Sequence, residues 1–141
     1  METRIAADFA RQRFMTLLGA TLVRVGPAEV EITLPITADL TQHTGVVHAG
    51  VLTAIVDSAC GFAAATRIPP DQVPVSVEFK VNLLAPATGD TLRAIGRVVR
   101  AGRTITVCTG DVWAINGAES WLVAIMQATM MAVAKKDAGV S

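Results

Sequence analysis

Apolar and polar residues alternate almost without interruption over residues 75–83. One set of positions holds Val75, Val77, Phe79, Val81 and Leu83, and the positions between them are polar. Successive side chains of a β-strand point to opposite faces, so this alternation predicts a strand with one buried face. The polar face of that strand includes Ser76 and Lys80.

Other segments carry strand patterns separated by turn residues. Residues 20–25 and 29–34 are rich in β-forming residues and flank Gly26-Pro27, which predicts a hairpin or a sheet edge. In the second half of the chain, strands are predicted over residues 91–100, 104–113 and 121–133. The last of these is apolar on both faces, as expected of a strand covered by a helix on one side and by other protein on the other.

Two segments have helical patterns. In residues 3–19, Thr3 can cap a helix, Gly19 can end it, and an apolar stripe predicts that the helix is amphipathic and peripheral. That stripe consists of Ile5, Phe9, Leu17 and Leu18. The second helix is predicted over residues 48–66 and is apolar nearly all round, which is typical of a buried helix. Pro69-Pro70 cannot continue it.

The predicted order is one helix, two strands, a long buried helix and four strands. This order predicts an α+β fold in which an antiparallel sheet wraps around the central helix. It has no βαβ alternation, and the sequence has no GxGxxG or Walker motif, so a Rossmann domain is excluded. With 141 residues, we expect one domain with a core over about 20–134 and a flexible C-terminal tail over 135–141.

Composition narrows the possible partners. Hydrophobic residues make up 52% of the chain and charged residues 17%, which indicates that part of the surface meets another subunit. The formal net charge is zero and the arginines are scattered, so neither nucleic acid nor a membrane surface is expected as a partner.

Cys60 and Cys108 have no CxxC spacing and are expected to be buried, reduced thiols. With no secretory signal at the N-terminus, we expect a cytoplasmic protein.

The sequence QHTGVVHAGVLTAIVD, from Gln42 to Asp57, places one carboxylate inside the apolar helix. Burying an ionised carboxylate without a partner costs several kcal/mol or raises its pKa. Asp57 therefore needs either a structural partner or a chemical task. His43, His48 and Asp57 do not have the spacing of a common zinc site, so no metal is expected.

The same run resembles the signature of hotdog-fold acyl-CoA thioesterases. In that family a Gln or Asn, a Gly and a His-Gly-Gly triplet precede an Asp or Glu on the central helix, and Gln42, Gly45, His48 and Asp57 match this spacing. The sequence VSVEFKVNLLAPATGDTL resembles the following strand in the phenylacetate-degradation (PaaI-like) branch. The resemblance covers about residues 20–134 and implies the hotdog fold, hydrolysis of an acyl-CoA and no cofactor beyond the coenzyme A of the substrate.

The resemblance also implies a site. A backbone N–H at the helix start, from Ala49 or Gly50, would hold the thioester carbonyl, because the first turn of a helix offers unpaired N–H groups to a developing oxyanion. Asp57 would attack the carbonyl directly or activate water. The family further implies that Gln42 and His48 shape the thioester end of the pocket and that Ser76 positions the attacking water. Without the motif, Ser76 is an ordinary polar residue on the outer face of its strand.

Geometry adds a requirement of its own. Asp57 lies eight residues beyond Ala49, so the two are about 12 Å apart along one helix. If both act on one thioester, Asp57 must come from a second subunit with an antiparallel helix. The family agrees with this, and we expect a homo-oligomer built as a dimer of dimers, a homotetramer.

One residue departs from the family motif. Ala49 stands where the family has the first glycine of His-Gly-Gly. An alanine still donates its N–H, but its methyl group would strain a turn that needed a positive φ. We expect activity to be retained, because residues at a helix start usually have negative φ.

Other readings stay open at this stage. Arg100 and Arg103 could bind coenzyme A phosphates or simply be solvated residues of a turn. A hotdog dehydratase or hydratase would use a His with a carboxylate, and a non-catalytic acyl-CoA-binding module would use the same pocket without chemistry. Assays of thiol release and of enoyl hydration separate these alternatives. The acyl group is left open by the sequence.

Overall fold

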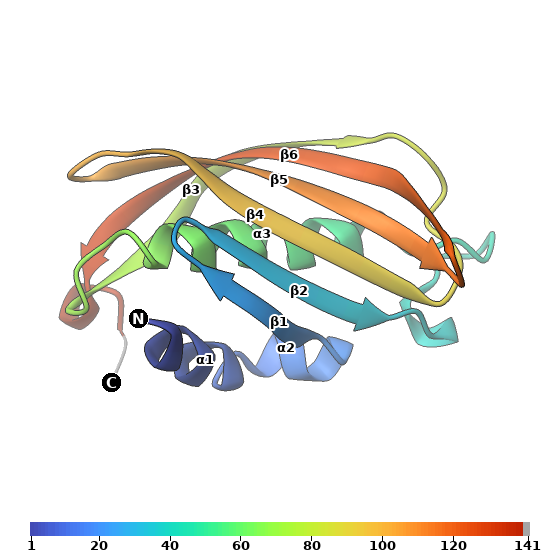
Figure 1. The fold of residues 1–141 in the computed structure, drawn as a ribbon, viewed down its shortest axis with the longest axis horizontal. Coiled ribbons are helices and arrows are strands. Elements are labelled where there is room, and N and C mark those ends of the chain that lie inside the picture. The colour runs from blue at the N-terminus through green and yellow to red at the C-terminus, as the bar shows by residue number, and fades with distance from the viewer. Residues whose placement is uncertain (140–141) are drawn as a thin grey trace.

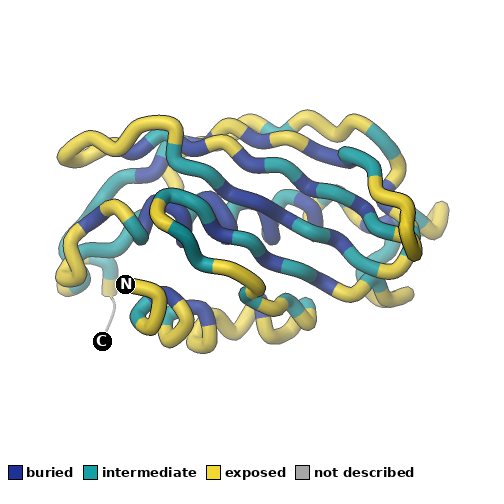
Figure 2. The backbone as a smooth tube through the Cα atoms, viewed as in Figure 1, coloured by how far each residue is buried: buried dark blue, intermediate teal, exposed yellow. Residues whose placement is uncertain are grey.

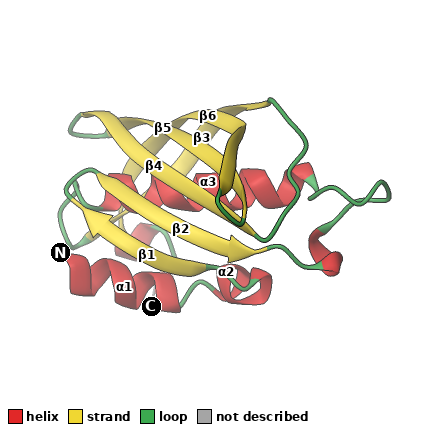
Figure 3. Cartoon of the chain, turned by 45° about the vertical axis from the view of Figure 1, so that its right-hand side comes forward, coloured by secondary structure: helices red, strands yellow, loops and turns green. Residues whose placement is uncertain are grey.

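The computed structural model describes residues 1–139 and contains a six-stranded antiparallel sheet that curves around one long helix. Figures 1 and 3 show the sheet on one side of the central helix, with the N-terminal helices beside the sheet edge formed by β1. The strand order in the sheet is β1-β2-β4-β5-β6-β3. The predicted α+β hotdog architecture is confirmed.

The helices are α1 Glu2–Ala10, α2 Arg13–Leu18 and α3 Ala49–Ala65. The strands are β1 Thr21–Gly26, β2 Glu29–Pro35, β3 Gln72–Leu83, β4 Thr91–Ala101, β5 Ile105–Asn116 and β6 Glu119–Ala134.

The inner face of the sheet approaches α3 very closely. Gly96 of β4 and Gly110 of β5 are paired across the two strands. A Cβ atom on Gly96 would lie 2.3 Å from the backbone carbon of Ala59, and one on Gly110 would lie 2.4 Å from Cγ2 of Val56. Only glycine fits at these two positions, because any side chain would push the helix off the sheet. Figure 2 shows the buried residues concentrated where α3 meets the central strands.

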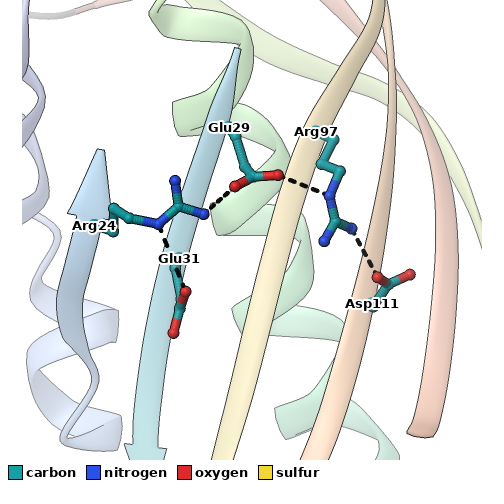
Figure 4. Close-up of polar contacts among 5 residues, drawn as sticks. All are labelled: Arg24, Glu29, Glu31, Arg97 and Asp111. Carbon is teal, nitrogen blue, oxygen red and sulfur yellow. Dashed lines mark hydrogen bonds and ion pairs between the residues drawn. The ribbon is translucent and has the colours of Figure 1, made fainter. Parts of the chain in front are cut away.

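The outer face of the sheet, away from α3, carries a chain of ion pairs (Figure 4). Arg97 pairs with Glu29 at 2.8 Å and with Asp111 at 2.7 Å, and Glu29 also pairs with Arg24. Arg24 lies 3.9 Å from Glu31. The chain spans β1, β2, β4 and β5. These side chains are partly exposed, so each pair contributes little to stability.

β3 forms one edge of the sheet and differs from its prediction. In the described chain it pairs with β6 alone, and Val77, Phe79 and Leu83 are 55%, 43% and 54% exposed. The prediction that the apolar face of this strand is buried is therefore wrong for a single chain. The alternation correctly predicted a strand, but it could not show whether the apolar residues meet the chain's own core.

A β-bulge changes the facing of β3. Ser76 pairs with Met130 of β6 and Glu78 pairs with the next residue, Thr129, so Val77 is an extra residue in β3. A bulge re-aims the side chains on one side of it. Ser76 consequently lies on the inner face, opposite the buried Met130, together with Phe79. An unbroken alternation would place Ser76 and Phe79 on opposite faces.

The N-terminal segment is two helices rather than the single helix predicted over 3–19. The chain breaks at Arg11 and Gln12, and Met1, not Thr3, lies at the N-cap of α1. The break lets each short helix turn its own apolar residues inward: Ile5 and Phe9 from α1, and Met15 from α2. Leu17, expected on the buried stripe, is 80% exposed. Gly19 ends α2 with a positive φ of 81°, as predicted.

The end of the described chain returns to the start of the molecule. Lys135–Asp137, expected to be part of a flexible tail, forms the short 3-10 helix η2. Arg4 of α1 and Gly139, which follows η2, line the same hollow. Residues 140 and 141 of the predicted tail lie outside the described residues.

Candidate active site

Asp57 lies on the flank of α3 beside the edge strand β3, away from the helix residues that meet Gly96 and Gly110, and it is half-buried. The hydroxyl of Ser76 donates a hydrogen bond of 2.8 Å to Oδ1 of Asp57. Burial raises the pKa of the Asp57 carboxyl above its ordinary value, and the hydrogen bond from Ser76 partly offsets this effect. A carboxylate with a raised pKa is a stronger base than an exposed one, which suits it to take a proton from water.

The bulge in β3 brings Ser76 to Asp57, so the structure joins these two predicted site residues. Ser76 Oγ is also 3.3 Å from the sulfur of the buried Met130, its cross-strand neighbour. The alternative position on the outer face of the strand is ruled out by this contact. The pattern of residues 75–83 gave no sign of the bulge.

The start of α3 holds the other predicted groups. His48 is the N-cap residue, and its Nδ1 accepts a 2.8 Å hydrogen bond from the Gly50 N–H. Within residues 1–139, no hydrogen bond engages the Ala49 N–H. Of the two N–H groups that the sequence left open, Ala49 therefore offers the free donor. Among residues 1–139, the one non-glycine residue with a positive φ is Ala28. Ala49 therefore does not have the positive φ that would strain an alanine at this turn.

Gln42 and Gly45 shape the loop before α3. Both polar ends of the Gln42 side chain bind Thr44: Nε2 donates to its hydroxyl at 2.6 Å, and Oε1 accepts from its N–H at 2.8 Å. Gly45 has a φ of 88°, a conformation that favours glycine, and lies exposed at the turn. Gln42, His48 and Ala49 line one hollow of about 470 Å³, whereas Gly45 does not line it.

Asp57 and Ser76 line a different hollow of about 480 Å³. No residue is common to the linings of this hollow and the one at the start of α3. Within one chain, the carboxylate and the free N–H of Ala49 thus face separate spaces, as the spacing of about 12 Å along the helix requires. Each hollow holds half of the predicted site.

The sequence reasoning missed the part that the N-terminal segment plays. Arg4, Asp8, Arg11 and Gln12 line the Asp57 hollow together with residues of α3 and β3. The Ser58 hydroxyl donates a hydrogen bond of 3.3 Å to Oε1 of Gln12. The polar run from Arg11 to Arg13, which interrupts the apolar stripe, was the one available signal of the helix break.

Arg100 and Arg103 are exposed near the turn between β4 and β5. Figure 1 shows this turn at the end of the molecule opposite to the start of α3, so one chain does not bring these arginines to Ala49. They line neither of the two hollows that hold the other predicted residues. Their binding to coenzyme A phosphates stays a prediction.

The cysteines are buried and free, as predicted. Burial raises the pKa of the Cys108 thiol to about 11 and raises the pKa of Cys60 still further above its ordinary value, so neither thiol is a ready nucleophile. Within residues 1–139, no three His, Cys, Asp or Glu side chains gather as they would around a metal ion. In the same residues, no helix is long and apolar enough to cross a membrane.

Comparisons with known proteins agree with this architecture. A family model described as the thioesterase superfamily matches residues 44–120. The crystal structure of a thioesterase family protein from Silicibacter pomeroyi is 39% identical, with a TM-score of 0.92, and the match covers 94% of this chain and 98% of that one. The PaaI protein of the E. coli phenylacetic acid degradation operon has the same fold, with a TM-score of 0.83, 20% identity and coverage of 93% and 91%.

Two curated relatives match more distantly. The 1,4-dihydroxy-2-naphthoyl-CoA hydrolase of Listeria monocytogenes is 26% identical over 90 residues, which are 64% of this chain and 73% of that protein. A candidate esterase of Halobacterium salinarum is 30% identical over 98 residues, and the match spans 64% of its length. The matched segment of the family model contains the start of α3, Asp57 and Ser76. On the family model and the Silicibacter pomeroyi structure together, this chain belongs to the thioesterase superfamily and has the hotdog fold.

Proposed function

We propose that the protein hydrolyses an acyl-CoA thioester to a carboxylic acid and free coenzyme A. The observation that carries the proposal is the Ser76–Asp57 hydrogen bond between β3 and α3, which holds a carboxylate of raised pKa beside a hollow. The coenzyme A hydrolase among the relatives supports a coenzyme A thioester as the substrate class.

The reaction uses two groups of the chain. Asp57 either takes a proton from a water molecule that attacks the thioester carbonyl or attacks that carbonyl itself. The carbonyl oxygen gains negative charge as the new C–O bond forms, and the Ala49 N–H stabilises it. The C–S bond then breaks and the thiolate takes up a proton. Ser76 positions the carboxylate or the attacking water. In the direct route, water then hydrolyses the resulting anhydride.

The proposal includes a second copy of the chain. Asp57 of one subunit and Ala49 of the other would complete each site, because one helix keeps them about 12 Å apart. The edge strand β3 supports this arrangement, since its exposed apolar residues Val77, Phe79 and Leu83 need cover. We propose a dimer as the smallest active unit and a dimer of dimers as the full assembly.

Complementation between two inactive variants tests the shared site. Asp57→Asn removes the base. Ala49→Pro removes the one proposed N–H donor, and proline is well tolerated at the first position of a helix after an extended residue such as His48. Each variant alone should release almost no thiol from acyl-CoA substrates. Subunits mixed by unfolding and refolding together should recover about a quarter of wild-type activity, because half of the dimers are mixed and each holds one intact site.

Each failure has a distinct meaning in this experiment. Substantial activity of either variant alone would contradict the role given to that residue. Two inactive variants whose mixture stays inactive, although mixed dimers form, would contradict the shared site. Hydration of an enoyl-CoA without thiol release would favour the hydratase alternative. That alternative is weakened by His48, whose Nδ1 already binds the Gly50 N–H.

A further inference from the structure

We propose that Gln12 is a specificity-determining residue: its side chain closes the acyl end of the site, so that the site accepts compact acyl groups and rejects long chains. This inference rests on the proposed thioester hydrolysis at Asp57. It concerns the N-terminal segment, which the family model match over residues 44–120 does not include.

Two hollows meet at Asp57. The larger, of about 480 Å³, extends along α1, and the other, of about 360 Å³, extends along α2. The two linings share three residues: Gln12, Asp57 and Ser58. Gln12 is thus the one residue outside α3 that borders both spaces. It lies at the break between α1 and α2, and its side chain reaches Ser58 of α3.

The Gln12 side chain is held in this dividing position. Its Oε1 accepts the hydrogen bond from Ser58, the residue that follows Asp57. The side chain makes no capping hydrogen bond to α2, whereas its backbone groups bind Phe9 and Thr16. The side chain can therefore be changed without removing the interactions that shape the local backbone.

One wall of the larger hollow, formed by the N-terminal segment, is charged. Arg11 pairs with Asp8 at 2.5 Å, and Arg4 donates a 2.6 Å hydrogen bond to the carbonyl of Ala65, near the end of α3. An alkyl chain that reached this wall would remove water from charged groups without replacing their hydrogen bonds, which is unfavourable. The same hollow also has apolar lining residues, which include Phe62 and Met130, and Met130 contacts Ser76, the hydrogen-bond partner of Asp57.

A compact acyl group fits these boundaries. A volume of about 480 Å³ is in the range of small-molecule sites, which is roughly 300–1,000 Å³. The acyl group would lie against the apolar surface beside Asp57 and stop before the charged wall. A longer chain could continue past Asp57 and Ser58 into the second hollow, and the Gln12 side chain borders both spaces at that point.

A series of saturated acyl-CoA substrates from acetyl to dodecanoyl tests the proposal through kcat/KM for thiol release. The wild type should prefer a short acyl group and lose at least about tenfold in kcat/KM toward the longest ones. Gln12→Ala, which joins the two hollows, should raise the ratio of dodecanoyl to butanoyl kcat/KM by about tenfold. Gln12→Met keeps the volume and should retain the wild-type profile.

Gln127→Ala serves as the matched control, because Gln127 is exposed and lies outside both hollows. It should leave the profile unchanged. A flat wild-type profile, or a Gln12→Ala variant that loses activity equally on all substrates, would overturn the role of Gln12 and leave thioester hydrolysis standing. Absence of thiol release from every substrate by the wild type would instead overturn the proposed function, and the inference with it.

Discussion

The two faces of α3 meet their surroundings in opposite ways. On the face toward the central strands, Gly96 and Gly110 let the helix approach so closely that a single added carbon would overlap Ala59 or Val56. On the side toward α1 and the edge strand β3, the open face, Asp57 and Ser58 are half-buried, and a Cβ atom added to Gly61 would meet nothing within 4 Å. One helix thus combines a face with no spare volume and a face with two adjoining hollows.

The comparison separates the residues that maintain the fold from those that perform chemistry. A carboxylate on the sheet face would have neither water nor space for a substrate. On the open face, Asp57 keeps a hydrogen-bond donor and borders space for a ligand, yet it is buried enough for its pKa to rise. Substitutions on the two faces should therefore change different measured quantities.

The largest expected effect is on the open face. Asp57→Asn should lower kcat/KM for thiol release by about a thousandfold, in the range known for general-base catalysis. It should not lower the free energy of unfolding at neutral pH, because the uncharged amide avoids the burial of a charge and can still accept the Ser76 hydrogen bond. Kinetic assays and urea unfolding of the same preparation measure both quantities.

The pH dependence of the same variant has a definite sign. The native state binds the Asp57 proton more tightly than the unfolded state, so this residue makes the free energy of unfolding fall as pH rises from about 4 through the higher native pKa. Asp57→Asn removes this fall. The stability difference between variant and wild type should grow in favour of the variant over this range. A constant difference would contradict the raised pKa.

The next largest effect is expected on the sheet face. Gly96→Ala should lower the free energy of unfolding by about 3 kcal/mol, because the methyl carbon would lie 2.3 Å from helix backbone that cannot move aside. Urea unfolding followed by tryptophan fluorescence measures the loss. A change below about 1 kcal/mol would show that α3 can shift away from the sheet, and the contrast between the two faces would lose its basis.

A smaller effect is expected at Ser76. Ser76→Ala removes the hydrogen bond that lowers the pKa of Asp57, so the acid limb of the kcat/KM profile should move to higher pH. Activity on the alkaline plateau should fall about tenfold, in line with the loss of one hydrogen bond to a charged group. Thr129→Ala, a change on the outer face of the neighbouring strand, provides the control and should leave the pH profile in place.

The smallest effect is a gain in stability. Gly61→Ala should raise the free energy of unfolding by about 0.5–1 kcal/mol, because alanine favours the helix over glycine and the added methyl meets no atom of this chain. Urea unfolding at several protein concentrations measures it. A concentration-dependent loss of stability would instead place another subunit against this part of the open face.

Much of the fold could be predicted because its signals are local. The bounds of α3 follow from the apolar run between His48 and the prolines, and Gly19 ends α2 where the sequence places it. The break at Gln12 was missed because Leu17 and Leu18 continue the helical spacing of Ile5 and Phe9, so the pattern fits one helix of 17 residues as well as two short ones. Tertiary packing selects the two short helices. Phe9 packs against Phe62, with ring centroids 5.6 Å apart, and Met15 packs against the core.

The site was predictable to the extent that it depends on spacing along one helix. Asp57 and the start of α3 could be predicted in this way. The choice between the N–H groups of Ala49 and Gly50 could not, because it depends on the hydrogen bond between the Gly50 N–H and the His48 side chain. Ser76 reaches Asp57 because Val77 is an extra residue in β3, a matter of register between strands that alternation alone does not encode. Gln12 and Arg11 reach the site by tertiary packing alone.

The return of the chain to its own beginning has a practical consequence for protein production. Arg4 and Gly139 line the same hollow beside Asp57, although they stand at opposite ends of the described chain. A purification tag added close to either residue would therefore lie near the space proposed for the acyl group. Substrate profiles should be measured on protein from which such tags have been cleaved, since a tag could narrow the apparent range of substrates.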